Sequence, residues 1–134
     1  MTQGLDKPTL DLILSEMKRH GLVEETEFLP DPDTPERLRI RLDSAQYPLD
    51  TEAYLDVRWH INGSFRFHYH ESGSQGIDCR WDRHENPHNN RLHFHPPDSE
   101  NAVDLNMTVG HPLEILDTVM ARITERVEEL WDDQ

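Results

Sequence analysis

Strict alternation of apolar and polar residues dominates the middle of the chain. Residues 37–43 place an apolar side chain at every second position, and the pattern returns at 54–60, 65–70, 77–82 and, more briefly, 91–95. A period of two is typical of a β-strand that buries one face and exposes the other. The pattern therefore predicts five strands whose apolar side chains all lie on one side of a sheet.

Two segments with helical spacing flank these strands. Residues 8–20 begin with Pro8 and are followed by Gly21, and they repeat apolar residues at Leu10, Ile13, Leu14 and Met17. From Pro112 onward, one apolar helical stripe consists of Leu113, Leu116, Met120, Ile123, Val127 and Leu130. Such amphipathic helices cover the apolar face of a sheet. We therefore expect an α+β fold with an antiparallel five-stranded meander sheet and N- and C-terminal helices packed on one face, as a single domain over residues 1–134.

The register of the strands brings arginines together. A three-residue turn ending at a left-handed Gly63 pairs apolar with apolar residues across the second and third strands, and it sets Arg58 opposite Arg66. If the next turn covers residues 71–75, Arg66 also faces Arg80. Like charges directly opposite one another are unfavourable unless an anion lies over them. The register therefore predicts a row of three arginines that can hold an anion.

Charge is distributed unevenly between this face and the rest of the chain. The net charge is −14, from 27 acidic and 13 basic residues. The predicted polar face nevertheless carries seven arginines, Arg37, Arg39, Arg41, Arg58, Arg66, Arg80 and Arg91, against four acids, Asp43, Asp56, Asp78 and Asp82. Arginine binds phosphate through two parallel hydrogen bonds, so this face favours a phosphate or polyanion partner such as RNA. The acidic remainder suggests a halophilic, archaeal source with a salt-rich cytoplasm.

Composition also constrains the compartment and the single cysteine. No apolar run approaches the roughly 20 residues that cross a bilayer, and the first residues lack the layout of a signal peptide. We therefore expect a cytoplasmic protein with no membrane partner. Cys79 alternates with Ile77 and Trp81, which predicts a structural thiol in the core rather than a catalytic one.

Histidines join the arginines on the polar face. They are His60, His68, His70, His93 and His95. Histidine exchanges protons near neutral pH, and RNA backbone cleavage needs a base for the 2′-hydroxyl, an acid for the leaving oxygen and cations for the phosphorane charge. The histidines that suit catalysis are His68, His70, His88, His93 and His95, with Arg58, Arg66 and Arg80 binding phosphate and with neither metal nor cofactor.

Two other interpretations of the histidines stay open. Histidines on an open sheet face can be merely exposed polar residues, and His88, in the loop over residues 82–90, can be a solvated turn residue. A divalent-metal site is the second alternative, because His68 and His70, and likewise His93 and His95, each put two imidazoles on one side of a strand. The neighbouring arginines oppose a dication, so we rank the metal site below the anion site.

A segment of the polar face resembles a known family. The order Arg80-Trp81-Asp82, Asn86-Pro87-His88 and Leu92-His93-Phe94-His95 resembles the TumE-type toxins of toxin–antitoxin pairs, which carry an Arg-(Tyr/Trp)-Asp-Asn-x-Pro-His stretch followed by a Phe-Pro-His segment. The resemblance extends to the layout of a leading helix, a strand meander and a closing helix. The chain departs from the pattern by inserting residues 83–85 and by placing Pro96-Pro97 where a further His-x-His is expected.

The resemblance implies a small growth-inhibiting toxin with a cognate antitoxin protein as its partner. Its motif falls on Arg80, Asp82, Pro87, His88 and His95, and it thereby implies that Arg80 and Asp82 join the histidines as catalytic residues. Together with the polar face, it leads to the hypothesis of a toxin that acts on RNA as a metal-independent ribonuclease. The alternative is a non-catalytic module that binds an anionic partner, either antitoxin or nucleic acid, on the same face.

Overall fold

The computed structural model describes residues 4–73, 75–84, 92–97, 101–105 and 110–134. Its elements are, in chain order, α1 (Lys7–Met17), β1 (Val23–Leu29), β2 (Arg37–Leu42), the short 3₁₀ helix η1 (Ser44–Gln46), β3 (Ala53–Trp59), β4 (Phe65–Glu71), β5 (Asp78–Arg83), β6 (His93–His95), β7 (Val103–Asp104) and α2 (Pro112–Asp132). The predicted α+β class therefore holds.

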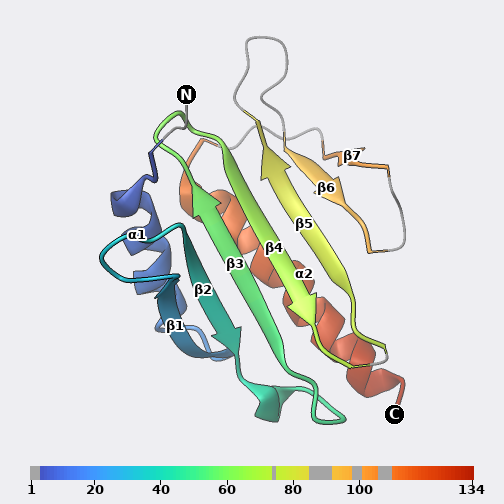
Figure 1. Cartoon of the computed structure of the whole chain (residues 1–134). Coiled ribbons are helices and arrows are strands. Elements are labelled where there is room, and N and C mark those ends of the chain that lie inside the picture. The colour runs from blue at the N-terminus through green and yellow to red at the C-terminus, as the bar shows by residue number, and fades with distance from the viewer. Residues whose placement is uncertain (1–3, 74, 85–91, 98–100, 106–109) are drawn as a thin grey trace.

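The strands form one antiparallel sheet in chain order, from β1 at one edge to β7 at the other (Figure 1). This sheet has seven strands, so the prediction of five is wrong. β1 escaped notice because its register shifts between Val23 and Glu25, which breaks the alternation that marks a strand. β7 has two residues, too few to show any period.

The turn between β3 and β4 has the predicted form. Gly63 has a φ of 92°, in the left-handed region, and Trp59 pairs with Phe65. The two rings stack with centroids 4.5 Å apart. Arg58 consequently lies opposite Arg66, as expected.

The register between β4 and β5 differs from the prediction by two residues. Glu71 belongs to β4, and its N–H donates to the carbonyl of Ile77, so the turn covers residues 72–76, one position further along the chain than the 71–75 loop that we expected. Arg66 therefore lies opposite Asp82, and Arg80 lies opposite His68. The predicted row of three arginines is wrong beyond its first pair.

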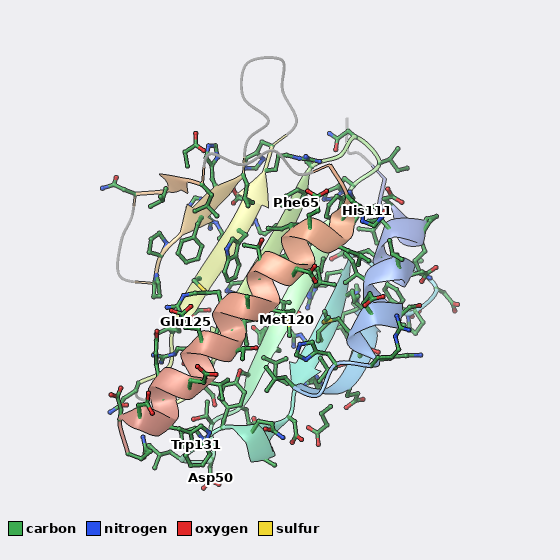
Figure 2. All side chains as sticks on the ribbon, turned by 180° about the vertical axis from the view of Figure 1, so that it is seen from behind. Asp50, Phe65, His111, Met120, Glu125 and Trp131 are labelled. Carbon is green, nitrogen blue, oxygen red and sulfur yellow. The ribbon has the colours of Figure 1, made fainter. Side chains whose placement is uncertain are left out.

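Both helices lie on the same face of the sheet. α1 packs on β1, β2 and β3, whereas α2 crosses behind the middle of the sheet (Figure 1). Asp6 caps α1 by accepting from the N–H of Thr9 at 3.2 Å, and α1 ends at Met17 rather than at residue 20. His111 caps α2, which runs from His111 near one end of the sheet to Trp131 near the other (Figure 2).

The core lies between the sheet and the two helices. Every apolar strand residue that the alternation assigned to the inner face is buried or packs against this core, as the buried Phe67, Leu55 and Ile40 illustrate. Cys79 is 7% exposed, and burial raises the pKa of its thiol to about 12. A protonated, enclosed thiol is a poor nucleophile, in agreement with the predicted structural role.

A buried polar network ties α2 to the sheet. The hydroxyl of Tyr69 donates to Glu71 at 2.6 Å and lies 2.7 Å from the hydroxyl of Tyr47. Arg126 of α2 donates to both Glu71 oxygens, at 2.9 and 2.8 Å. Glu71 is 3% exposed, so its charge is compensated within the protein rather than by water.

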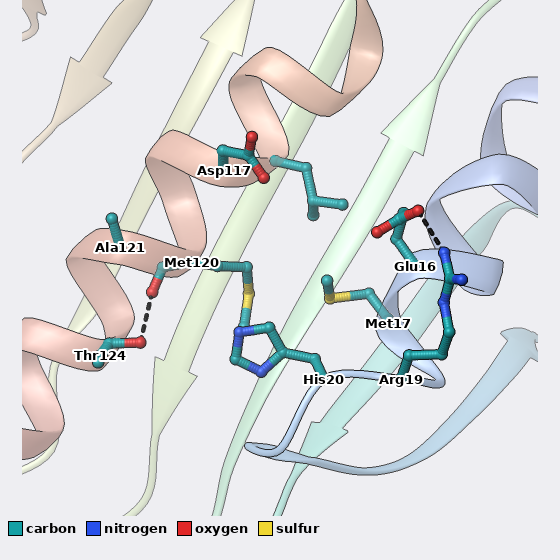
Figure 3. A pocket seen from close by; sticks show the side chains of 9 residues that line it. Glu16, Met17, Arg19, His20, Asp117, Met120, Ala121 and Thr124 are labelled. Carbon is teal, nitrogen blue, oxygen red and sulfur yellow. Dashed lines mark hydrogen bonds and ion pairs between the residues drawn. The ribbon is translucent and has the colours of Figure 1, made fainter.

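A seam of about 330 Å³ separates α1 from α2 (Figure 3). Met17, Leu116 and Met120 form its floor, and all three are almost fully buried. An ion pair of 2.6 Å between Arg19 and Glu16 lies at its edge.

Among the described residues, no helix is long and apolar enough to cross a membrane.

Candidate functional site

The face of the sheet opposite the helices, which we call the open face, carries the polar side chains of every alternating strand. From β2 to β6 these are Arg37, Arg39, Arg41, Tyr54, Asp56, Arg58, Arg66, His68, His70, Asp78, Arg80, Asp82, His93 and His95. α1 and α2 both lie on the other face (Figure 1), so neither of them covers these groups. The strand alternation alone puts arginines, histidines and carboxylates side by side.

The two edges of the open face are acidic. Glu25 and Glu27 of β1 lie opposite arginines of β2, and Asp104 of β7 lies opposite His93. Directly opposite residues share a face. These three carboxylates cancel the positive excess that the sequence predicted for the whole face, an excess that also counted Arg91, which lies outside the described residues. The prediction of a face-wide positive charge is therefore wrong, and the arginines concentrate at the centre.

A hollow of about 240 Å³ lies at that centre. Its lining, which we call the arginine hollow, consists of Arg37, Asp56, Arg58, Arg66, His68 and Arg80. Four guanidinium groups thus converge from four neighbouring strands, and Asp56 is the one carboxylate among the lining residues.

Asp56 is already engaged by the neighbouring strand. Arg39 donates to both of its oxygens at 2.8 Å, and the Arg37 Nε atom lies 3.3 Å away. The hydrogen bond to Asp56 raises the pKa of Arg39, whose guanidinium also lies 3.8 Å from the centre of the Tyr54 ring. Asp56 therefore orders the β2 arginines and offers little negative charge to the rest of the hollow.

Arg58 and Arg66 face each other across β3 and β4 within the hollow. Arg66 reaches Asp82 at 3.9 Å, the long end of an ion pair. Among the residues that the structure describes, no carboxylate lies within ion-pairing distance of Arg58. Arg58 and Arg66 therefore repel each other in the free protein. An external anion that binds between them would relieve this repulsion and accept hydrogen bonds from both.

Asp82 holds the basic side chains at one side of the arginine hollow. It is 2% exposed, although it lies on the open face, because three basic side chains surround it. Its carboxylate lies 3.2 Å from Nε of Arg80 and 3.2 Å from Nε2 of His95. A carboxylate only accepts, so Nε2 of His95 must carry a proton, and its Nδ1 atom faces the Arg80 guanidinium at 3.5 Å.

Asp78 holds two histidines at the other side. Oδ1 of Asp78 lies 2.9 Å from Nε2 of His68 and 2.9 Å from Nδ1 of His70. Partial burial acts to raise the pKa of Asp78, but the hydrogen bonds from His70 and His68 outweigh it and lower this pKa below its ordinary value. Each histidine therefore donates to Asp78 and keeps its other ring nitrogen for another role.

The structure brings together only part of the predicted site. Arg58, Arg66 and Arg80 line the arginine hollow with His68, and His95 adjoins it through Asp82. His70 lies opposite Asp78, toward the end of β4. His93 lies opposite Asp82, beyond the hollow's lining residues, and His88 lies outside the described residues.

Sequence reasoning missed two lining residues. Arg37 and Asp56 were placed on the polar face but were not assigned to the site. Their positions in the alternation put them on the correct face, but only the strand register shows that they meet Arg58 and His68. In the part of the chain that the structure describes, no group of three or more His, Cys, Asp or Glu side chains is arranged to hold a metal ion.

Comparison with known protein families matches residues 10–127 to the family described as Toxin TumE. The chain belongs to the TumE toxin family. The match covers all seven strands, the buried residues of α1 and those of α2 as far as Val127, and it includes the arginine hollow. No curated protein and no solved structure matches the chain.

Membership in the TumE family identifies the chain as a toxin and, in general terms, implies an antitoxin as its partner. The expected resemblance is thereby confirmed. The family describes the role of the chain in the cell, and the chemistry must be argued from the open face.

Proposed function

We propose that this TumE-family toxin acts on RNA and binds the RNA backbone in the arginine hollow. The observation that carries the proposal is the pair Arg58 and Arg66, two guanidiniums directly opposite each other in a hollow with one, already engaged, carboxylate. A phosphate diester is singly charged and presents two oxygens, which suits two guanidinium forks. The chain is strongly acidic overall, so such a local concentration of arginine has a specific use.

The proposed reaction is cleavage by the neighbouring 2′-hydroxyl. A base removes the hydroxyl proton, the O2′–P bond forms, the P–O5′ bond breaks, and an acid gives its proton to O5′. The products are a 2′,3′-cyclic phosphate and a 5′-hydroxyl, with no net consumption of protons. Arginines at the phosphate stabilise the charge that builds on the phosphorane.

Two histidines suit the proton transfers. His68 lines the hollow, and because Asp78 holds its Nε2, its Nδ1 is the atom that can accept a proton. His95 is oriented by Asp82 and lies beside Arg80, so it is our candidate for the second proton transfer. His70, His88 and His93 stay candidates for the same roles.

The test uses purified protein and a short single-stranded RNA in which one nucleotide at a time is replaced by its deoxy form. We expect cleavage that leaves a 2′,3′-cyclic phosphate and that stops at each deoxy position. Arg58→Ala should abolish both cleavage and growth arrest, whereas Arg41→Ala, which removes an arginine paired with Glu27 outside the arginine hollow, should retain both. Cleavage that ignores the 2′-hydroxyl would overturn the mechanism.

A second function is favoured by one specific observation. Asp78 and Asp82 hydrogen-bond to three of the four described histidines of the proposed catalytic set, as carboxylates do in purely structural ion pairs. The open face would then bind an anionic partner, antitoxin or nucleic acid, without turnover. Under this alternative, His68→Ala and His95→Ala weaken binding of a labelled RNA but no product forms with any variant.

A further inference from the structure

A second surface, far from the arginine hollow, combines exposed apolar side chains with an unfavourable backbone. It is a pocket of about 600 Å³ between the connection from β2 to β3 and the end of α2. We call it the Leu49–Trp131 pocket, and its lining is Ser44, Ala45, Tyr47, Pro48, Leu49, Asp50, Glu52, Trp131 and Gln134. Figure 2 shows Trp131 and Asp50 side by side at this end of the molecule.

The pocket exposes two large apolar side chains. Leu49 is 72% exposed and Trp131 is 50% exposed, whereas the helix seam buries its methionines almost fully. Tyr47, 4% exposed, also lines the pocket, and its hydroxyl is held by the hydrogen bond to Tyr69. Tryptophan and tyrosine are enriched among the residues that contribute most of the binding energy in protein interfaces.

Leu49 is exposed by a backbone conformation that is unfavourable for leucine. Leu49 and Asp50 have φ values of 60° and 55°, in the left-handed region that asparagine and aspartate tolerate but that leucine avoids. The surrounding chain is ordered: Tyr47 and Thr51 both make backbone hydrogen bonds within the connection, and Nε1 of Trp131 donates to the carbonyl of Gln46 at 2.8 Å. A leucine in this conformation that points into water contributes no packing to the fold, which makes its side chain a candidate for a contact outside the chain.

Charge at the rim identifies the kind of partner. Asp50 and Glu52 line the pocket, Asp132 and Asp133 directly follow Trp131, and no basic side chain is among the lining residues. A second copy of the chain would bring the same acids against these acids. A segment with an apolar side chain flanked by lysine or arginine is complementary both to the floor and to the rim.

We propose that the Leu49–Trp131 pocket binds such a basic and apolar segment of the antitoxin. The toxin family implies that partner, and the pocket supplies the complementary chemistry. The antitoxin would then be anchored at the opposite end of β3 from the Gly63 turn and independently of the arginine hollow. This inference does not depend on RNA as the substrate, since it concerns another surface.

The experiment measures binding of purified cognate antitoxin to the toxin by calorimetry. Leu49→Asn removes the apolar side chain but suits the left-handed backbone, so this variant should unfold at the same or a higher temperature while affinity falls at least ten-fold. Trp131→Ala should lower affinity similarly, with Trp131→Phe as the substitute if the alanine variant does not fold. Ile61→Asn removes an equally exposed residue (69%) at the opposite end of β3 and is the matched control with unchanged affinity.

Two further measurements identify the occupant. Asp50→Asn and Glu52→Gln together should reduce affinity and its dependence on salt, because they remove the rim charge. Among peptides tiled along the antitoxin, only those with an apolar residue flanked by basic ones should bind the wild type and fail with Leu49→Asn. Wild-type affinity in both Leu49→Asn and Trp131→Phe would overturn the proposal. Self-association of the wild type that Leu49→Asn abolishes would also overturn it, in favour of a second copy.

Discussion

Arg58 and Arg66 lie directly opposite each other on neighbouring strands, and within the described residues only Arg66 has a carboxylate in reach, at 3.9 Å. Their repulsion lowers the stability of the free protein, and an anion between them relieves it. Stability and binding therefore respond in opposite directions to the removal of one of them.

The first prediction follows from that opposition. Arg58→Ala should raise the free energy of unfolding by roughly 0.2–1 kcal/mol, since it removes a like-charge contact. Its affinity for a single-stranded RNA should fall about ten-fold or more, as expected for loss of a charged hydrogen bond worth roughly 1.5–3 kcal/mol. Urea titration and filter binding measure the two effects. A variant that is destabilised and binds normally would show that Arg58 is structural.

The second prediction concerns inorganic anions. Pyrophosphate should raise the melting temperature of the wild type, because a ligand that binds only the folded state stabilises it in proportion to the logarithm of its concentration. Arg58→Ala should lose most of this increase, and Arg41→Ala should keep it, since Arg41 is paired with Glu27. Equal shifts in all three proteins would mean that pyrophosphate acts through general screening and not in the arginine hollow.

The third prediction tests the buried ion pair between α2 and the sheet. Arg126→Met leaves the carboxylate of Glu71, 3% exposed, without its cationic partner, and should cost about 3–5 kcal/mol of unfolding free energy. Adding Glu71→Gln should restore a large part of that loss, because the uncompensated charge disappears. Chemical denaturation of the two single variants and the double variant gives the coupling. Additive losses would argue against the pair.

The fourth prediction is a loss of stability at alkaline pH. Burial raises the pKa of Cys79 to about 12, and it also raises the pKa values of Tyr47 and Tyr69. Above roughly pH 8.5 the unfolded thiol ionises whereas the folded thiol keeps its proton. The unfolded state then binds fewer protons, so stability falls by about 1.4 kcal/mol per pH unit for each such group.

Cys79→Ala isolates the thiol. Between pH 8.5 and 10, before the tyrosines contribute, the wild type should lose about 2 kcal/mol more than the variant. The same burial predicts that native Cys79 resists alkylation at pH 8 and reacts only after unfolding. Rapid alkylation of the folded protein would contradict both expectations.

The sequence revealed most of the sheet because alternation is a local property. The apolar positions of β2, β3 and β4 follow a strict period of two, and all of them are buried. In β1 the register shift between Val23 and Glu25 interrupts that period. The consecutive acids Glu24 and Glu25 also hide which of its residues point toward the core. A two-residue strand such as β7 is defined by its partner rather than by its own sequence.

The register error at Glu71 has a different origin. A glutamate at the end of an alternating run indicates a turn, and only the arrival of Arg126, 55 residues later, makes it a buried strand residue. The same limit applied to the candidate site. Alternation assigns side chains to a face, but it does not show that Asp82 contacts Arg80 and His95, or that acids at both edges offset the charge of the face.

Those acidic edges limit the footprint of any polyanion on the open face. Glu25 and Glu27 on β1 and Asp104 on β7 stand at opposite borders of a sheet roughly 30 Å wide, with the arginines between them. A rigid duplex laid across the strands would bring its outer phosphates over these carboxylates. A bulge, a loop or a free end, which lowers one or two phosphates into the middle, avoids that contact. The shape of the nucleic acid, more than its length, thus determines which molecules reach the arginines.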